Sequence, residues 1–162
     1  MTPQELVQRS DRILARAAWR LIPFMALMYV VAFLDRSNIS FAALQMNKEL
    51  GFSPQVYGNA AGIFFLGYVL FEIPSNLMLD RVGARRWISR ILFSWGLVAC
   101  LMAFMTSAQQ FNGLRLLLGV AEAGFFPGIV LYLSQWVPAG DRARTLAGFM
   151  LAIPVAGLLG GP

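Results

Sequence analysis

The stretch GLRLLLGVAEAGFFPGIVLYLSQWV, residues 113–137, is apolar along almost its whole length, yet it contains Arg115 and Glu122. A helix of this length, at about 1.5 Å per residue, crosses the roughly 30 Å hydrocarbon core of a membrane. Four further stretches are predominantly apolar, at residues 21–44, 57–79, 87–107 and 145–162. The last is shorter than the usual span of about 20 residues. The sequence therefore predicts an all-α membrane protein with four complete transmembrane helices and a truncated fifth.

The amino-acid composition agrees with a surface that faces lipid. Hydrophobic residues make up 58% of the chain and charged residues 13%, which is roughly half the charged fraction of an average soluble domain. So few charged side chains cannot cover a water-facing globule of this size. The chain has no histidine and one cysteine, so zinc sites, a disulfide framework and serine–histidine hydrolysis are excluded. We therefore expect neither an enzyme nor a protein with a metal or cofactor.

The positive charges predict how the chain crosses the membrane. The net charge is +5, but the cations form no single basic patch, which argues against nucleic acid as a partner. They gather before the first apolar stretch and after the second and fourth, as Arg9, Arg12, Arg16, Arg20, Arg81, Arg85, Arg86, Arg90, Arg142 and Arg144. Membrane proteins retain Lys and Arg on the cytoplasmic side. We expect a multi-pass membrane protein, with residues 1–20 as a cytoplasmic amphipathic N-terminus.

Among the ionisable groups inside the predicted spans four stand out, and they are Asp35, Arg36, Arg115 and Glu122. Charged side chains at mid-membrane are costly, so each is a candidate functional group. Burial favours the neutral form of a carboxylate, whereas a nearby arginine favours the charged form. An anion bound to Arg36 would withdraw that compensation, so a neighbouring carboxylate would take up a proton more readily. Alternatively, the four groups form a permanently neutralised network that only pairs the helices.

Other polar groups in the spans are weaker candidates. Tyr29, Tyr68 and Asn38 can form hydrogen bonds to a ligand, although tyrosines in membrane helices usually serve packing or lie at the interface. Glu72 lies near the inner end of the second stretch, where a role in an inner gate and simple hydration are equal alternatives.

Small residues and prolines indicate where the helices could approach each other and bend. GxxxG spacings, which permit close helix contact, occur at residues 58–62, 124–128 and 157–161. Pro74, Pro127 and Pro154 interrupt hydrogen bonding within the second, fourth and fifth stretches, so we expect bends there.

Several motifs resemble those of one transporter family. Residues 76–86, NLMLDRVGARR, resemble the loop signature between helices two and three of the major facilitator superfamily, with Asn76 in place of the usual first glycine. Residues 115–119, RLLLG, match the superfamily's arginine motif in helix four. With FLDRSNIS at residues 33–40 and GVAEAG at 119–124, the chain resembles the N-terminal part of an anion:cation symporter, most of all the bacterial tartrate and 4-hydroxyphenylacetate branch.

The resemblance implies roles for the residues in the spans. Arg36 would bind a substrate carboxylate, and Tyr68 would approach the substrate. Asp35 and Glu122 would be the proton-linked pair, and Arg115 would support Glu122. The implied architecture is the N-terminal part of a major facilitator fold, in which helices one and four line the transport cavity.

A second group of residues would form a cytoplasmic gate. The resemblance implies that Asp80, with Arg81 and Arg85, latches the cytoplasmic side against a helix of the C-terminal half, and Glu72 is a candidate for the same gate. That half is a predicted partner, together with the lipid bilayer, a small organic anion and protons.

The prediction for function is proton-coupled symport of a small organic carboxylate by alternating access. One alternative is a drug:proton antiporter of the same superfamily, because its helix-five motif associated with antiporters has the spacing of Gly148, Gly157, Gly161 and Pro162. Another alternative is a truncated membrane fragment that does not transport.

Overall fold

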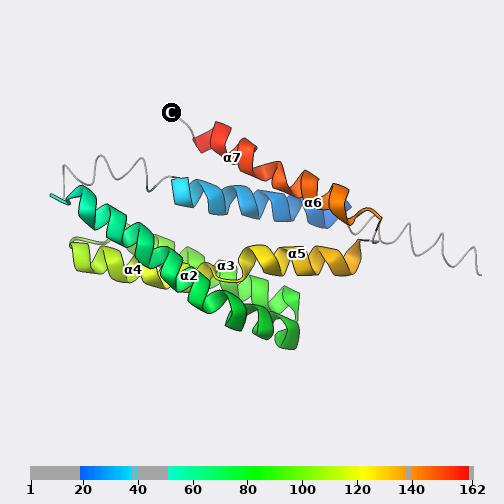
Figure 1. Cartoon of the computed structure of the whole chain (residues 1–162), viewed down its shortest axis with the longest axis horizontal. Coiled ribbons are helices and arrows are strands. Elements are labelled where there is room, and N and C mark those ends of the chain that lie inside the picture. Colours follow the sequence, from blue (N-terminus) through cyan, green and yellow to red (C-terminus); the bar gives the residue numbers. More distant parts are fainter. Residues whose placement is uncertain (1–18, 38, 40–50, 138–139, 161–162) are drawn as a thin grey trace, which may run out of the picture. The chain divides into compact units, whose positions relative to one another are not determined.

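The computed structural model describes residues 19–37, 39, 51–137 and 140–160, and every regular element within these residues is a helix. Residues 19–37 are helical, and the later elements are α2 (Pro54–Val82), α3 (Ala84–Met102), α4 (Ala108–Glu122), α5 (Phe125–Trp136), α6 (Arg142–Met150) and α7 (Ala152–Gly160) (Figure 1). The predicted all-α fold class is confirmed. Residues 1–18 of the predicted N-terminus, residues 40–44 of the first apolar stretch and the candidate Asn38 lie outside the described residues.

The described helices form two compact units. One unit contains α2, α3, α4 and the first residues of α5, up to Gly128. The other contains helix 19–37, the remainder of α5 from Ile129 onward, α6 and α7.

A single glycine joins α2 to α3. The N–H of Gly83 donates to the carbonyl oxygen of Leu79 at 2.9 Å, which closes the last turn of α2. Gly83 has a φ of 90°, which residues with a Cβ rarely adopt, so the chain turns there and α3 begins at Ala84. The helix thus starts at 84 rather than at 87, because the arginines at its start are helical but not apolar, and it ends at 102 rather than at 107.

The fourth helical segment begins at a serine cap. The backbone N–H of Gln110 donates to Ser107 Oγ at 3.3 Å, and α4 starts at Ala108 rather than at the predicted Gly113. A serine side chain at this position satisfies one of the N–H groups that the first turn of a helix leaves unpaired. Gln109 and Gln110 in this first turn are polar and exposed, so hydropathy alone places the start too late.

Two of the predicted spans are interrupted, each three to four residues before a proline. The segment predicted at 113–137 turns at Ala123 and Gly124, which has a φ of 80°, and continues as α5. The segment predicted at 145–162 consists of α6 and α7 with a turn at Leu151. Proline has no N–H, so Pro127 cannot bond to the carbonyl of Ala123, nor can Pro154 bond to that of Met150. The lost hydrogen bonds weaken the helix at both points. The same loss at Pro74 does not interrupt α2, which continues from Pro54 to Val82.

Two helical segments in the described part of the chain are long and apolar enough to cross a membrane. They are Pro54–Val82, with a mean hydropathy of 1.5, and Ala108–Trp136, with a mean hydropathy of 1.9, each 29 residues long. Most of α2's large apolar side chains are exposed, including Phe65, Val69 and Ile73. An exposed apolar face of this kind belongs in lipid or against another apolar surface.

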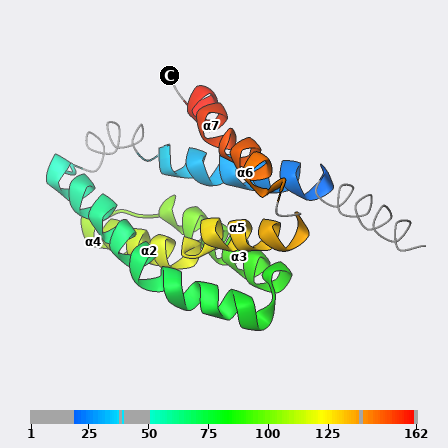
Figure 2. The same cartoon turned by 45° about the vertical axis from the view of Figure 1, so that its right-hand side comes forward.

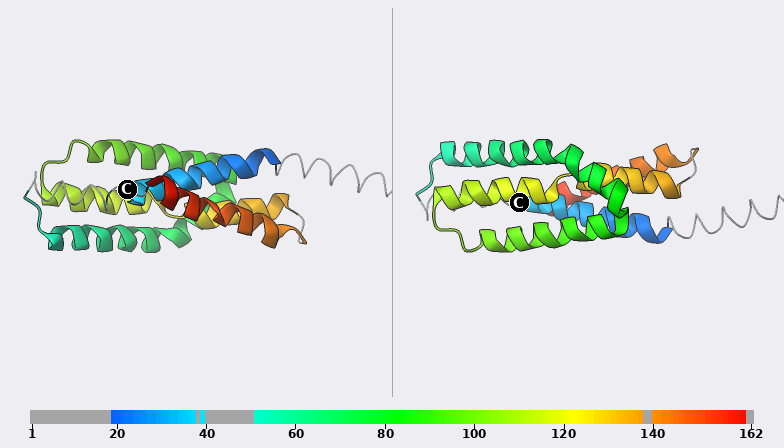
Figure 3. Two further views of the ribbon diagram at one scale, coloured as in Figure 1. Left: turned by 90° about the horizontal axis from the view of Figure 1, so that it is seen from above. Right: turned by 90° about the horizontal axis from the view of Figure 1, so that it is seen from below.

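Within the α2–α3–α4 unit, α4 lies between the other two helices and packs against both (Figures 2 and 3). The closest contact joins α2 to α4 through two glycines. A Cβ at Gly67 would lie 2.8 Å from the carbonyl oxygen of Leu116, and a Cβ at Gly119 would meet the carbonyl oxygen of Phe64. Both separations are too short for real Cβ atoms, so glycine at both positions is what allows the two backbones to approach.

The GxxxG predictions are only partly right. Gly124 and Gly128 face Ser75 and Leu79 of α2, where a Cβ at Gly128 would lie 2.5 Å from Leu79 Cδ1. By contrast, a Cβ at Gly58, Gly62 or Gly157 would meet no described atom within 4 Å. The GxxxG at residues 58–62 therefore makes no close helix contact within the described part of the chain, because that side of α2 has no helix packed on it there.

In the other unit, helix 19–37 runs in the same direction as α6 and α7 (Figure 3). The ring of Tyr29 packs on Phe149 of α6 with 4.9 Å between the ring centroids, and Phe149 is fully buried. Such aromatic contacts stabilise a helix pair beyond the burial of area alone. This contact holds α6 beside helix 19–37.

Candidate functional site

The first part of the candidate site is a buried arginine on α4. Arg115 is 6% exposed, and its Cζ lies 4.5 Å from the centroid of the Phe64 ring on α2. This distance is that of a cation–π contact, which is strongest when the cation is removed from water. The Phe64 ring is in turn 6.2 Å from that of Tyr68, one turn further along α2. Phe64 thus connects two predicted site residues, Arg115 and Tyr68.

Glu122 is the most deeply buried ionisable group of the described residues, with 1% of its surface exposed. It is the last residue of α4, two turns after Arg115 and three residues after Gly119. A Cβ at Gly119 would lie 3.0 Å from the backbone nitrogen of Tyr68, so this turn of α4 lies directly against α2. Because residues three and four apart share a helix face, α4 presents Arg115, Gly119 and Glu122 on the same side.

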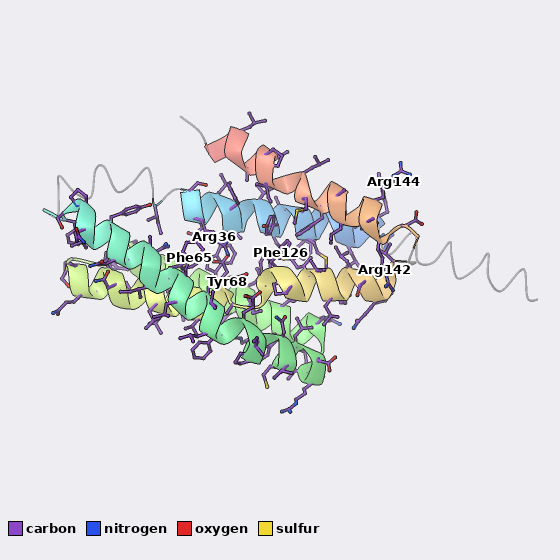
Figure 4. The ribbon with its side chains drawn as sticks, in the orientation of Figure 1. Arg36, Phe65, Tyr68, Phe126, Arg142 and Arg144 are labelled. Atoms are coloured by element: carbon purple, nitrogen blue, oxygen red, sulfur yellow. The ribbon has the colours of Figure 1, made fainter. Side chains whose placement is uncertain are left out.

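Helix 19–37 provides the other candidates. Tyr29, Asp35 and Arg36 are half-buried, and Arg36 lies close to the end of the described helix (Figure 4). Asp35 and Arg36 are adjacent, so their side chains point about 100° apart around the helix axis. Tyr29 uses its ring to pack on Phe149, which agrees with the packing role usual for tyrosines in membrane helices.

The predicted cytoplasmic-gate residues surround the turn between α2 and α3. Asp80, Arg81 and Arg85 are all exposed, on either side of Gly83, whereas Glu72 lies two turns earlier on α2 and is half-buried. The turn therefore presents three charged side chains on one short segment, while Glu72 is separate from them.

A buried serine and a tryptophan connect this turn to the interruption of the fourth span. Trp87 Nε1 donates to Ser75 Oγ at 2.9 Å, and Ser75 is 6% exposed and packs against Gly124. The guanidinium of Arg90 lies 4.3 Å from the centroid of the Trp87 ring. From its position near the end of an apolar stretch, Trp87 would be expected only at the membrane interface. The sequence does not predict its hydrogen bond, because Ser75 lies on another helix.

We expect Trp87→Phe to destabilise the protein by about 1 kcal/mol. The variant keeps an aromatic ring but removes the N–H that bonds to Ser75, and hydrogen bonds of this kind in membrane proteins contribute on that order. Thermal unfolding of the purified full-length protein in detergent measures the effect. Trp19→Phe is the matched control because Trp19 is 81% exposed. If Trp87→Phe and Ser75→Ala act additively in the double variant, the hydrogen bond does not contribute.

Phe64 is the site residue that sequence reasoning missed. It lies one turn before Tyr68 on the same face of α2, and this spacing was the signal that could have found it. Among the described residues, no group of three or more His, Cys, Asp or Glu side chains could hold a metal ion.

A buried arginine and a buried glutamate on a helix of membrane-spanning length are features of a polytopic transport protein. The chain belongs to the Major Facilitator Superfamily, whose family model matches residues 25–162. This confirms the family that the motifs indicated. The superfamily and the relatives described below are transporters, not enzymes.

Three relatives illustrate the similarity. The chain is 59% identical, over 93% of its length, to a protein of Agrobacterium vitis named "Putative tartrate transporter". It is 45% identical to a quinolone resistance transporter of Acinetobacter baumannii over 93% of its length, and 42% identical to the inner membrane transport protein RhmT of Escherichia coli over 94%. The chain spans 35% of each of these relatives.

Proposed function

We propose that this chain is the N-terminal part of a proton-coupled symporter that carries a small organic anion by alternating access. The observation that supports this most directly is Glu122, a carboxylate that is 1% exposed inside a helical segment of membrane-spanning length. A carboxylate in such a place is costly, and a group that takes up and releases a proton is one reason to retain it. The proposal places the protein in the bacterial inner membrane with a cytoplasmic N-terminus.

In this proposal the anion binds to Arg36. An arginine binds a carboxylate through two parallel N–H···O bonds, which gives both affinity and orientation. Arg36 is half-buried, so its charge is partly shielded from water, which strengthens its attraction for an anion. Tyr68, Tyr29 and Asn38 are proposed to add hydrogen bonds to the substrate. The relative from Agrobacterium vitis bears a name that specifies tartrate, a small dicarboxylate, which supports this class of substrate.

Protons would offset the electrical cost of carrying the anion. Moving one negative charge into a cell at 100 mV, inside negative, costs about 2.3 kcal/mol, and each co-transported proton cancels one such charge. Asp35 and Glu122 are the proposed proton carriers. Arg115 is proposed to support Glu122, and its contact with Phe64 fixes the position of the guanidinium on α4. Asp80, Arg81, Arg85 and Glu72 are proposed as the cytoplasmic gate toward the C-terminal half.

Uptake by the full-length transporter in proteoliposomes tests the proposal. We expect small carboxylates, and not neutral or cationic compounds, to accumulate inside when the outside is made acidic. Arg36→Ala should abolish substrate binding and therefore uptake, since no other cation is proposed to bind the carboxylate. Arg86→Ala is the control, because it removes an exposed arginine outside the proposed site. Full proton-driven uptake by the Arg36→Ala variant would contradict the proposed role of Arg36.

A drug:proton antiporter is the second candidate, and the 45% sequence identity to a quinolone resistance transporter favours it. An antiporter for cationic or neutral drugs would have no need for Arg36 as an anion-binding group. The same proteoliposomes distinguish the two functions, because an antiporter expels protons from an acidic lumen as its substrate enters.

A further inference from the structure

A small cavity lies where the end of α5 meets the start of α6. Its volume is about 160 Å³, and it is lined by Val130, Leu133, Ser134, Val137, Arg142, Ala143, Thr145 and Leu146. All of these residues belong to one compact unit. Ser134 Oγ donates to the carbonyl oxygen of Leu131 at 2.7 Å, so its hydroxyl is engaged within its own helix and the wall formed by α5 is effectively apolar. None of the residues proposed for transport lines this cavity.

The size of the cavity limits what can occupy it. Apolar cavities of roughly 150 Å³ remain free of water and accept a small apolar group such as benzene, whereas sites for drug-sized ligands begin near 300 Å³. The occupant should therefore insert one short apolar segment and keep the rest of its structure outside. Arg142 and Ala143 are both exposed, so the cavity reaches the surface beside them.

The charges around this opening are mainly positive. Arg142 and Arg144 are exposed at the first turn of α6 (Figure 4), whose N-terminal end also carries a partial positive charge from the helix dipole. Asp141 is the one opposing charge at the start of this helix. In the same unit Arg20 is exposed at the start of helix 19–37, which begins at the same end as α6 (Figure 3). An anionic group is therefore favoured outside the cavity.

The geometry of Arg142 suits an anionic headgroup. Its Nε donates to the carbonyl oxygen of Val137 at 3.1 Å, which attaches the base of the guanidinium to the end of α5. An arginine has five N–H donors in a planar fork, so this bond leaves the four N–H groups of the two Nη atoms for other acceptors. A guanidinium held in this way is pre-organised for a phosphate at the opening of the cavity.

We propose that this cavity binds an anionic glycerophospholipid, with a segment of one acyl chain between α5 and α6 and the phosphate at Arg142 and Arg144. Basic pockets between membrane helices are general binding sites for anionic lipid headgroups. The exposed Trp19 at the same end of the unit agrees with a position at the membrane interface, where tryptophan is enriched. The inference depends on the chain lying in a membrane and does not depend on which anion is transported.

Native mass spectrometry of the purified full-length transporter tests this inference, without substrate or a proton gradient. Dioleoyl phosphatidylglycerol is compared with dioleoyl phosphatidylcholine, which has the same chains but no net charge, and with glycerol 1-phosphate, which has no chain. We expect saturable binding of the first lipid alone. Each of Arg142→Ala and Arg144→Ala should weaken it about fivefold, as expected for one basic residue near an anionic lipid.

Two further variants separate the cavity from the charges. Ala143→Phe and Ser134→Leu fill the cavity but keep both arginines, and each should reduce binding of phosphatidylglycerol. Arg86→Ala and Arg36→Ala should leave it unchanged, so failure of the transport proposal would not affect this result. Equal binding of both lipids in all variants, or equal binding of glycerol 1-phosphate, would overturn the inference.

Discussion

Glu122→Gln will abolish accumulation driven by a proton gradient while substrate exchange continues. Glutamine has nearly the same shape as glutamate and fits the same buried position, but it cannot take up or release a proton. Each coupled proton in a gradient of one pH unit supports about tenfold accumulation. The variant should therefore lose this tenfold accumulation, so that the internal substrate concentration does not exceed the external one. Binding and the conformational change do not require proton release in this proposal, so exchange should remain.

Proteoliposomes containing the full-length transporter provide both measurements. Net uptake under an imposed pH gradient reports proton coupling, and counterflow of labelled substrate without a gradient reports exchange. Asp141→Asn is the control, because it removes an exposed carboxylate at the start of α6 that has no proposed role in transport. Unchanged accumulation by Glu122→Gln would contradict proton coupling through this residue. Loss of exchange together with accumulation would instead mean that Glu122 is needed for the fold or for substrate binding.

Gly119→Ala will destabilise the protein, although alanine is normally the better helix former. A Cβ at this position would collide with the carbonyl oxygen of Phe64 and approach the backbone nitrogen of Tyr68 at 3.0 Å. Backbone atoms cannot rotate away as a side chain can, so α2 and α4 would have to separate. Overpacking of this kind costs about 1–3 kcal/mol. It would also displace Phe64 from Arg115, so transport should fall with stability.

Gly113→Ala on the same helix is the matched control. A Cβ at Gly113 would meet no described atom within 4 Å, and replacing a helical glycine by alanine stabilises a helix by roughly 0.5–1 kcal/mol. The two substitutions are chemically identical, so thermal unfolding of the two variants in detergent isolates the effect of the α2–α4 contact. Equal unfolding temperatures would show that the backbones do not approach as closely as described.

Much of the fold could be predicted because membrane helices are specified locally. Length and hydropathy predict α2 and the combined α4–α5 segment, and the motifs indicate the family. The helix ends were less accurate. The cap at Ser107 and the charged start of α3 are polar, and therefore do not register in a hydropathy profile. The prolines at 127 and 154 were predicted to bend the helices, and the interruptions lie three to four residues before each of them.

The candidate site was predicted only in part. Arg115 and Glu122 were identified because a charge in an apolar stretch is visible in the sequence, and both are buried. Phe64, which contacts Arg115, carries no charge, and its spacing from Tyr68 is a weak signal, because one more phenylalanine in an apolar helix looks like packing. The hydrogen bond from Trp87 to Ser75 also joins two helices, so neither residue indicates its partner.

The sequence by itself determined that this is an all-helical membrane protein and which stretches carry ionisable groups, because hydrophobic length and charge are properties of each segment alone. Only the tertiary structure decided which glycines bring helices together. Gly67 and Gly119 make close backbone contact while the GxxxG at residues 58–62 meets nothing within 4 Å in the described residues. The physical reason is that such a contact depends on the rotation and register of two helices at once, and the spacing within one helix does not specify either of these.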